Sequence, residues 1–182
     1  MIRGVTIYGN PILKRKSEPV KDIDSSIKRL GADMMETMYH YSGVGLAAPQ
    51  VGESLRVITI DPRNDEFGPR VLINPKITER SGEVIGEEGC LSLPNIYGRV
   101  NRNLTVSISY TDLEGREHDE EWTGLAARIA LHEIDHLNGV LFIERLDEKQ
   151  LEGLRDQLRN MKREHKELEK IGPQIIEKMR GI

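Results

Sequence analysis

The chain has 182 residues, of which 37% are hydrophobic and 31% are charged, and its formal net charge at neutral pH is -4. This length fits one domain, no apolar run is long enough to span a membrane, and the net charge gives no indication of a nucleic-acid partner. Residues 1–10 lack the pattern of a secretory or transit peptide, so we expect a cytoplasmic chain that binds neither membrane nor DNA.

The first predicted element is a helix that Ser25 or Ser26 is placed to cap. Its apolar residues keep helical spacing, namely Ile27, Leu30, Met34, Met38 and Tyr41. The next residues, 42–50, include two glycines and a proline, which favour an ordered loop over further helix.

The middle of the chain is predicted to be mostly antiparallel sheet. Val- and Ile-rich stretches at 55–60 and 71–73 indicate strands, and each is followed by a residue pair that contains proline. Apolar and polar residues then alternate over 104–110, before turn residues at 112–115 that end on glycine. This pattern predicts a β-hairpin.

Two helices are predicted to follow the sheet. Residues 124–137 are almost wholly apolar, and Asn138-Gly139 supplies a stop signal, so this helix should be buried. Asp147 and Gln150 resemble a capping box that opens a long amphipathic helix, which Gly172-Pro173 would end.

The order of these elements favours an α+β fold. We expect antiparallel or mixed β-sheets around a buried central metal-binding helix, with an N-terminal helix and a long C-terminal helix. Residues 1–146 should form the catalytic domain, and residues 147–182 a helical extension of the same domain.

The chemistry concentrates in the buried helix, where His132 and His136 lie one turn apart and Glu133 lies between them. Two imidazoles at this spacing can bind one metal ion. A single histidine on an apolar face is usually a core residue, but burying these ionisable groups without partners would cost several kcal/mol. A metal site is therefore preferred over a chance match. Asp135 is rotated away from the metal-facing side of the helix and is expected to be a structural partner.

Cys90 is the better candidate for the third metal ligand, although a single cysteine is often just a small buried residue. As the only cysteine, it cannot form an intramolecular disulfide. Flanking glycines let its backbone approach a ligand closely, and coordination would deprotonate the thiol. The downstream candidates are poorer: Glu144 is expected on a loop or strand, and the others lie in or at the start of the solvated last helix, namely Glu148, Glu152 and His165.

Three segments together resemble the motifs of peptide deformylases. They are Gly43–Gln50 (GVGLAAPQ), Glu88–Ser92 (EGCLS) and His132–His136 (HEIDH), in the order of that family. The likeness runs from Gly9 to Phe142 and covers about the first 145 residues.

The resemblance implies hydrolysis of the formyl group from the N-terminal formyl-methionine of nascent polypeptides. Cys90, His132 and His136 would hold the metal and leave a position open for water, and Glu133 would carry the proton. The Leu91 backbone N–H and the Gln50 side chain would stabilise the negative charge on the formyl oxygen.

The resemblance also places the peptide in an extended conformation. The Gly45 N–H and the Val44 and Gly89 carbonyls would hold its backbone. The methionine side chain would enter an apolar slot, for which Val44, Leu125 and Ile129 are candidates. Leu125, Ile129 and His132 share one side of the helix, although each apolar residue is also explained by ordinary core packing.

The ligand set does not decide which metal is bound. Two imidazoles and a thiolate accept Fe(II), Zn(II), Ni(II) or Co(II), and the family resemblance favours Fe(II) in the cell. The last helix has a locally basic stretch, and a comparable helix docks bacterial family members on the ribosome, so the ribosome is an expected partner.

Two positions depart from the family pattern. Leu131 stands where many members have Gln, immediately before the metal-binding motif, which affects only hydrogen bonds around the ligands. Tyr97 replaces an Arg of the best-known enterobacterial pattern, which leaves contacts to later substrate residues open.

Two other classes of protein remain alternatives. A zinc peptidase shares the His-Glu-x-x-His type of motif but requires a third ligand other than Cys90. A domain with a structural metal would need a fourth protein ligand to close the site.

Overall fold

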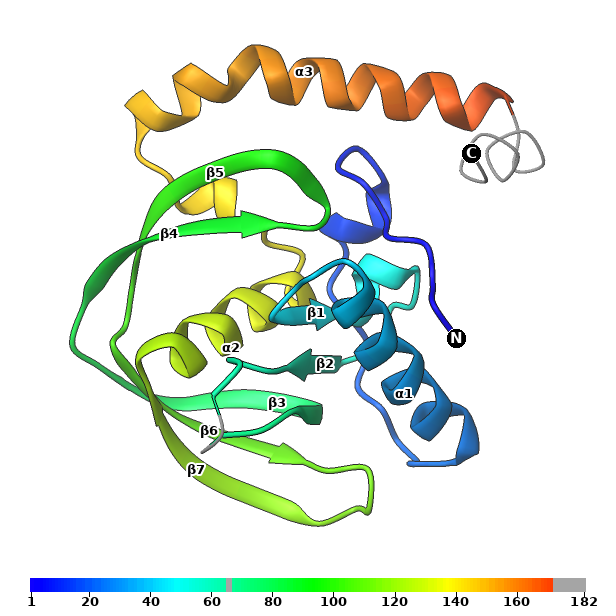
Figure 1. Ribbon diagram of the computed structural model, residues 1–182, viewed down its shortest axis with the longest axis vertical. Coiled ribbons are helices and arrows are strands. Elements are labelled where there is room, and N and C mark those ends of the chain that lie inside the picture. Colours follow the sequence, from blue (N-terminus) through cyan, green and yellow to red (C-terminus); the bar gives the residue numbers. More distant parts are fainter. Residues whose placement is uncertain (65–66, 172–182) are drawn as a thin grey trace.

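The computed structural model describes residues 1–64 and 67–171, and it places helix α2 between two antiparallel sheets (Figure 1). One sheet has the strand order β1-β2-β3-β6-β7, and β4 and β5 form the other. The strands are β1 Gly45–Ala47, β2 Val57–Ile60, β3 Arg70–Ser81, β4 Val84–Cys90, β5 Leu93–Arg102, β6 Thr105–Thr111 and β7 Glu117–Thr123. The helices are α1 Ser25–His40, α2 Gly124–Leu137 and α3 Glu148–Ile171, with short 3-10 helices η1 Pro11–Lys14, η2 Ala48–Val51 and η3 Phe142–Arg145. The α+β prediction is confirmed.

Helix α1 begins after Asp24, which caps it. The Asp24 carboxylate accepts hydrogen bonds from the backbone N–H groups of Ser26 at 2.9 Å and Ile27 at 3.1 Å. The prediction that Ser25 or Ser26 caps the helix is therefore wrong, because the preceding carboxylate already satisfies these amides. The predicted apolar face is buried from Ile27 to Met38.

The predicted loop over residues 42–50 is partly wrong. Residues 45–47 form strand β1, which pairs with β2 through Gly45 opposite Ile60 and Ala47 opposite Ile58, and η2 follows. The glycines and proline do end α1, but the extended backbone after Val44 finds hydrogen-bonding partners in β2. Buried backbone groups require such partners, so the segment is a strand.

Strand β3 is much longer than the predicted 71–73. It continues past Asn74, which adopts a left-handed φ of 53°, and its register with β6 shifts between Ile73 and Lys76. The irregularity accommodates Pro75, which has no N–H to donate to the ladder. The predicted hairpin after β6 is confirmed, with Gly115 at a φ of 82°.

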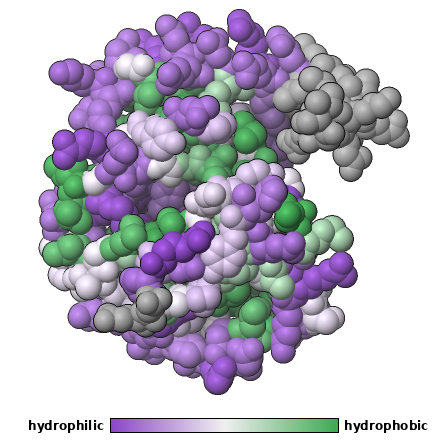
Figure 2. All heavy atoms as spheres, in the orientation of Figure 1, coloured by the Kyte–Doolittle hydropathy of each residue, from purple (hydrophilic) through white to green (hydrophobic). Residues whose placement is uncertain are grey.

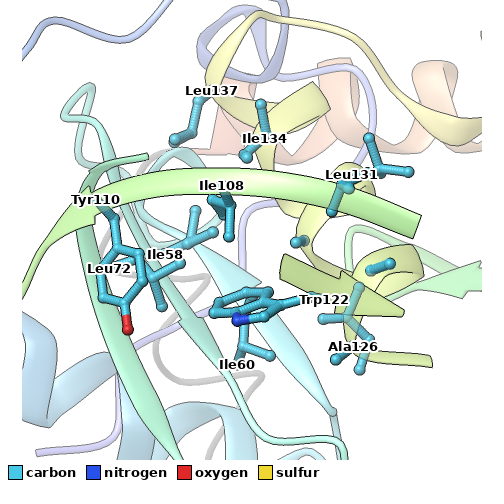
Figure 3. Close-up of a cluster of buried hydrophobic side chains, with 14 of the residues drawn as sticks. Ile58, Ile60, Leu72, Ile108, Tyr110, Trp122, Ala126, Leu131, Ile134 and Leu137 are labelled. Atoms are coloured by element: carbon cyan, nitrogen blue, oxygen red, sulfur yellow. The ribbon is translucent and has the colours of Figure 1, made fainter. Parts of the chain in front are cut away.

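Helix α2 packs its apolar side on the larger sheet. Figure 3 shows its side chains meeting those of β2, β3, β6 and β7, and the labelled residues include Ile58, Ile60, Leu72, Ile108, Tyr110, Trp122, Ala126, Leu131, Ile134 and Leu137. Full burial of one such aliphatic side chain contributes about 1.5–3 kcal/mol. The predicted bounds of this helix, 124–137, agree with the structure.

Helix α3 lies across the smaller sheet and the N-terminal segment (Figure 1). Asp147 caps its start by accepting the Gln150 N–H at 2.8 Å, as predicted. Leu158 is buried in a cluster with Tyr8, Val100 and Phe142. The predicted end at residues 172–173 lies outside the described residues. None of the described helices is both long and apolar enough to cross a membrane.

Candidate functional site

Helix α2 holds two histidines at the centre of the fold. It starts at Gly124, whose left-handed φ of 61° follows Thr123 at the end of β7, and it stops at Asn138. His132 and His136 are 8% and 1% exposed, and their ring centroids are 5.1 Å apart. The predicted pair of imidazoles therefore shares one face of the helix.

Strand β4 brings Cys90 to these histidines from 42 to 46 residues away in sequence. The Cys90 Sγ lies 3.2 Å from His136 Nε2, and one ligand atom from each of the three residues lies within 4.8 Å of the others. Burial lowers the pKa of His136 well below its usual value, so its ring is neutral and able to coordinate. A thiol and two imidazoles at this spacing fit a divalent transition metal.

Glu88 orients His132. Its Oε2 lies 2.9 Å from His132 Nδ1, so this nitrogen donates and Nε2 is left as the ligand atom. Burial opposes the charge of Glu88, but hydrogen bonds from Arg102 and His132 hold the pKa of its carboxyl well below the usual range. Arg102 reaches Glu88 with a bidentate fork at 2.9 Å, and Arg128 adds a bond of 2.8 Å.

Asp135 pairs with arginines outside the candidate ligand group. Its carboxylate accepts hydrogen bonds from Arg102 at 2.5 Å and from Arg145 at 2.5 and 2.6 Å. It is a structural partner of two guanidinium groups.

Glu133 lies beside the ligands and against the backbone of β1. Its Oε2 is buried and has no hydrogen-bonding partner among the described residues. A Cβ placed at Gly45 would collide with this carboxyl and would lie 2.7 Å from Ile129, so only glycine fits here. Burial raises the pKa of Glu133 to about 7. A carboxyl in this state can both accept and donate a proton near neutral pH.

Gln50 in η2 contacts the candidate ligand Cys90. Its Oε1 accepts the Ala47 N–H at 2.8 Å, which fixes the orientation of the amide. Its Nε2 then points at Cys90 Sγ and Ser92 Oγ, both at 3.3 Å. The donor end of Gln50 is therefore directed into the site.

These groups line a cleft of about 890 Å³. Of the predicted site residues, those that line it are Val44, Gly45, Gln50, Gly89, Cys90, Leu91, Leu125, Ile129, His132 and Glu133, and His136 lies buried beside it. Leu125 is 52% exposed at the rim, whereas Ile129 is 5% exposed. Figure 2 shows hydrophobic residues gathered in the middle of one face, below the hydrophilic surface of α3.

The Val44 carbonyl, which is predicted to bind the peptide backbone, already accepts one hydrogen bond within the protein. The Val44 carbonyl accepts the Asp61 N–H at 2.9 Å, which uses one of its two lone pairs within the sheet. Its role in holding a peptide stays a prediction.

The residues that surround the candidate ligands are not marked by the sequence pattern. Glu88 belongs to a recognised motif, but no role was assigned to it. Its place two residues before Cys90, on the same side of β4, was an available signal. Arg102 and Arg145 had no local signal, because their partners lie 10 to 33 residues away.

The two departures from the family pattern have clear positions. Leu131 is 7% exposed and belongs to the core between α2 and the larger sheet (Figure 3). Tyr97 is 61% exposed at the cleft, and its ring would lie 2.8 Å from a Cβ at Gly89. It therefore covers the Gly89 backbone.

Comparison with known proteins gives a consistent family. The family model described as polypeptide deformylase matches residues 2–152. The peptide deformylase of Dictyoglomus thermophilum is 48% identical over 151 residues, which span 83% of this chain and 97% of that protein. That of Chlorobaculum parvum is 43% identical over 153 residues, which span 82% of each chain.

Solved structures agree with the sequence relatives. The crystal structure of peptide deformylase from Thermus thermophilus matches with a TM-score of 0.83 and 45% identity, over 90% of this chain and 99% of that one. The enzyme from Legionella pneumophila matches with a TM-score of 0.81 and 38% identity, over 95% of this chain and all of that one. By its motifs, its fold and these matches, the chain belongs to the polypeptide deformylase family.

Proposed function

We propose that this chain hydrolyses the formyl group from the N-terminal formyl-methionine of nascent polypeptides, which releases formate and a free amine. Membership of the deformylase family supports this activity. The observation that carries the assignment of residues is the gathering of Cys90, His132 and His136 beside the Glu133 carboxyl at one cleft.

Glu133 is proposed to move the proton. A divalent ion held by Cys90, His132 and His136 would lower the pKa of a water molecule and polarise the formyl carbonyl. Glu133 accepts the proton of the attacking water and then delivers it to the amine nitrogen as the carbon–nitrogen bond breaks. Its buried position next to the ligands supports this role.

Gln50 and Leu91 are proposed to stabilise the negative charge that develops on the formyl oxygen. The Gln50 amide is preorganised by Ala47, so its N–H groups need no reorientation during the reaction. The Leu91 backbone N–H follows the ligand Cys90 directly and lies at the same cleft.

The peptide is proposed to lie extended between β1 and β4. Val44, Gly45 and Gly89 line this space, so their backbone groups are available to an extended peptide. Val44, Leu125 and Ile129 offer an apolar surface for the methionine side chain.

Two alternatives are disfavoured by particular contacts. The downstream carboxylate Glu144 pairs with Lys14 and accepts the Leu141 N–H, and His165 packs against Gly9. Neither joins the histidine pair as a zinc peptidase would need. Among the described residues, the candidate ligand group has three members, so it leaves a position open for water.

Hydrolysis of formyl-Met-Ala-Ser by the purified chain, with metal analysis of the same preparation, tests the activity. Release of formate in proportion to bound metal is expected. Acetyl-Met-Ala-Ser is the matched control, because its extra methyl group tests recognition of the formyl group. Cleavage of an internal peptide bond without formate release would contradict the proposal.

We propose Fe(II) as the metal in the cell, with zinc, nickel or cobalt able to occupy the same ligands. Anaerobic purification should yield iron, and Cys90→Ser should lose most of its metal during dialysis because a hydroxyl is a poorer ligand than a thiolate. Peroxide should inactivate the wild type. Full metal occupancy of the Ser variant would argue against Cys90 as a ligand.

We further propose that the chain acts in the cytoplasm, and that residues 147–182 extend the catalytic domain of residues 1–146 and dock on the ribosome. Exposed basic side chains along α3 suit RNA phosphates, namely Arg155, Arg159, Lys162, Arg163 and Lys166. Charge reversal at Arg155, Arg159 and Arg163 together should abolish salt-sensitive co-sedimentation with ribosomes while the short peptide is still hydrolysed. Unchanged co-sedimentation would refute the docking.

A further inference from the structure

A continuous chain of ionic contacts runs from the base of α3 to a metal ligand. Arg145 in η3 binds Asp135, Asp135 binds Arg102, Arg102 binds Glu88, and Glu88 binds His132. We call Arg145, Asp135, Arg102 and Glu88 the ion chain. Its contacts measure 2.5 to 2.9 Å, and its members come from η3, α2, β5 and β4.

We propose that Arg145 and Arg102 are positioning residues of the metal centre, which fix the His132 ring through Asp135 and Glu88. This inference rests on the proposed function, because it concerns how the ligand of that site is held.

Because the ion chain is buried, each of its ionic contacts depends on the neighbouring contact. The side chains of Arg102 and Glu88 are each 4% exposed, and that of Asp135 is 10% exposed. Water cannot replace a lost partner at this depth, so an unpaired charge must be compensated by its remaining neighbour. Loss of Arg145 therefore draws Arg102 toward Asp135 and weakens its fork on Glu88.

Geometry also limits how far Glu88 can move. Arg102 binds both oxygens of this carboxylate, which fixes its plane, and the same Oε2 that accepts from Arg102 faces His132. Arg128 holds only the other oxygen, Oε1. Without Arg102, Glu88 would rotate about the Arg128 contact, and the His132 ring would follow.

Arg145 is the better residue to change, because its side chain is 44% exposed and its loss leaves no cavity in the core. Arg145→Gln removes the charge, and Arg145→Lys restores it without the bidentate geometry. Arg29→Gln on α1 is the matched control, since Arg29 is exposed and lies outside both the candidate site and the proposed docking surface.

Full-length proteins loaded with Co(II) would be compared by visible absorption and by metal retention against a chelator. Arg145→Gln should shift the Co(II) spectrum and weaken metal retention about 3- to 10-fold, below the 10–100-fold typical of direct partners of a ligand. Arg145→Lys should recover most of the retention, and Arg29→Gln should match the wild type. KM for formyl-Met-Ala-Ser should stay within twofold in all three.

A wild-type spectrum and wild-type retention in Arg145→Gln would overturn the positioning role, even if its melting temperature falls. Arg102→Lys gives a second measurement and should weaken retention more than Arg145→Gln when it folds. Failure of the wild type itself to retain metal would refute the proposed function. A wild type that retains metal and releases formate, beside unaffected variants, would refute only this inference.

Discussion

Helices α2 and α3 both carry acidic and basic side chains, but in opposite environments. In α2, 11 of the 14 residues are buried, including two histidines, a glutamate and an aspartate. In α3, Leu158 is the one buried residue up to position 167, and the charged side chains face solvent. Carboxylates and basic groups are therefore held by specific partners in α2, whereas in α3 they are screened by water.

Burial therefore determines the chemical role of an ionisable side chain. A buried charge in α2 needs a specific partner, or its pKa shifts toward the neutral form as for Glu133, because burial of an unpaired charge costs several kcal/mol. Asp135 has two guanidinium groups, and His132 has Glu88. On α3, ion pairs such as Arg159 with Asp156 compete with water and contribute little. Four substitutions can test this comparison.

The largest effect is expected from Glu133→Gln. This change keeps the size of the side chain but removes its ability to accept a proton. Turnover of formyl-Met-Ala-Ser should fall about 10²- to 10⁴-fold, which is the usual contribution of a general acid or base. Bound metal should stay close to one per chain. Activity within tenfold of the wild type would show that another group moves the proton.

Leu131→Gln restores the residue that many family members have and should instead affect stability. Leu131 is packed in the core, so an amide there should lower the free energy of unfolding by about 2–3 kcal/mol. Metal content and turnover should stay within tenfold. Leu151→Gln on α3, where the leucine is 41% exposed, is the matched control and should shift stability by less than about 0.5 kcal/mol. If urea unfolding gave equal losses of unfolding free energy for Leu131→Gln and Leu151→Gln, the difference between α2 and α3 would be contradicted.

Asp112 lies at intermediate depth in the β6–β7 turn and predicts a pH effect. Burial opposes its charge, but hydrogen bonds from His118 and the Arg116 backbone hold the pKa of its carboxyl well below the usual value. The stabilisation is therefore complete above the unfolded pKa of about 3.9 and is lost as the pH falls below it. Asp112→Asn should cost about 1–2 kcal/mol at pH 7. The difference from the wild type should shrink below about pH 4 in denaturant titrations.

The smallest effect is expected from Glu152→Gln on α3. Its ion pair with Arg155 is largely solvated, with side chains 58% and 63% exposed. The free energy of unfolding should change by less than about 0.5 kcal/mol, and this small change should vanish in 1 M salt. A loss above 1 kcal/mol would mean that α3 is more tightly coupled to the domain than its exposure suggests.

Patterns confined to one element were predictable from the sequence. The bounds of α2 followed from its apolar run and its Asn138-Gly139 stop, and the turn at Gly115 followed from its composition. The three candidate ligands that the structure brings together were indicated by the spacing of His132 and His136 and by a single cysteine that follows Gly89. In each case the physical signal lies within a few residues of the feature.

Features that depend on distant partners were missed. Strand β1 was predicted as loop because its pairing with β2 cannot be seen in its glycines, and β3 passes Pro75 because β6 tolerates a register shift there. The ion chain connects residues 10 to 44 positions apart, and no local pattern marks Arg102 or Arg145. Such contacts are set by the packing of whole elements.

The Gln150 side chain has a consequence for handling shortened forms of the protein. Its amide accepts the Arg99 N–H at 2.7 Å and donates to the Arg99 carbonyl at 3.1 Å, so it occupies the β5 backbone as a neighbouring strand would. A chain cut before this residue would expose these groups as an open sheet edge, close to the exposed ring of Tyr97. Edge-to-edge self-association, and so poor solubility at high concentration, would follow from exposing this part of β5.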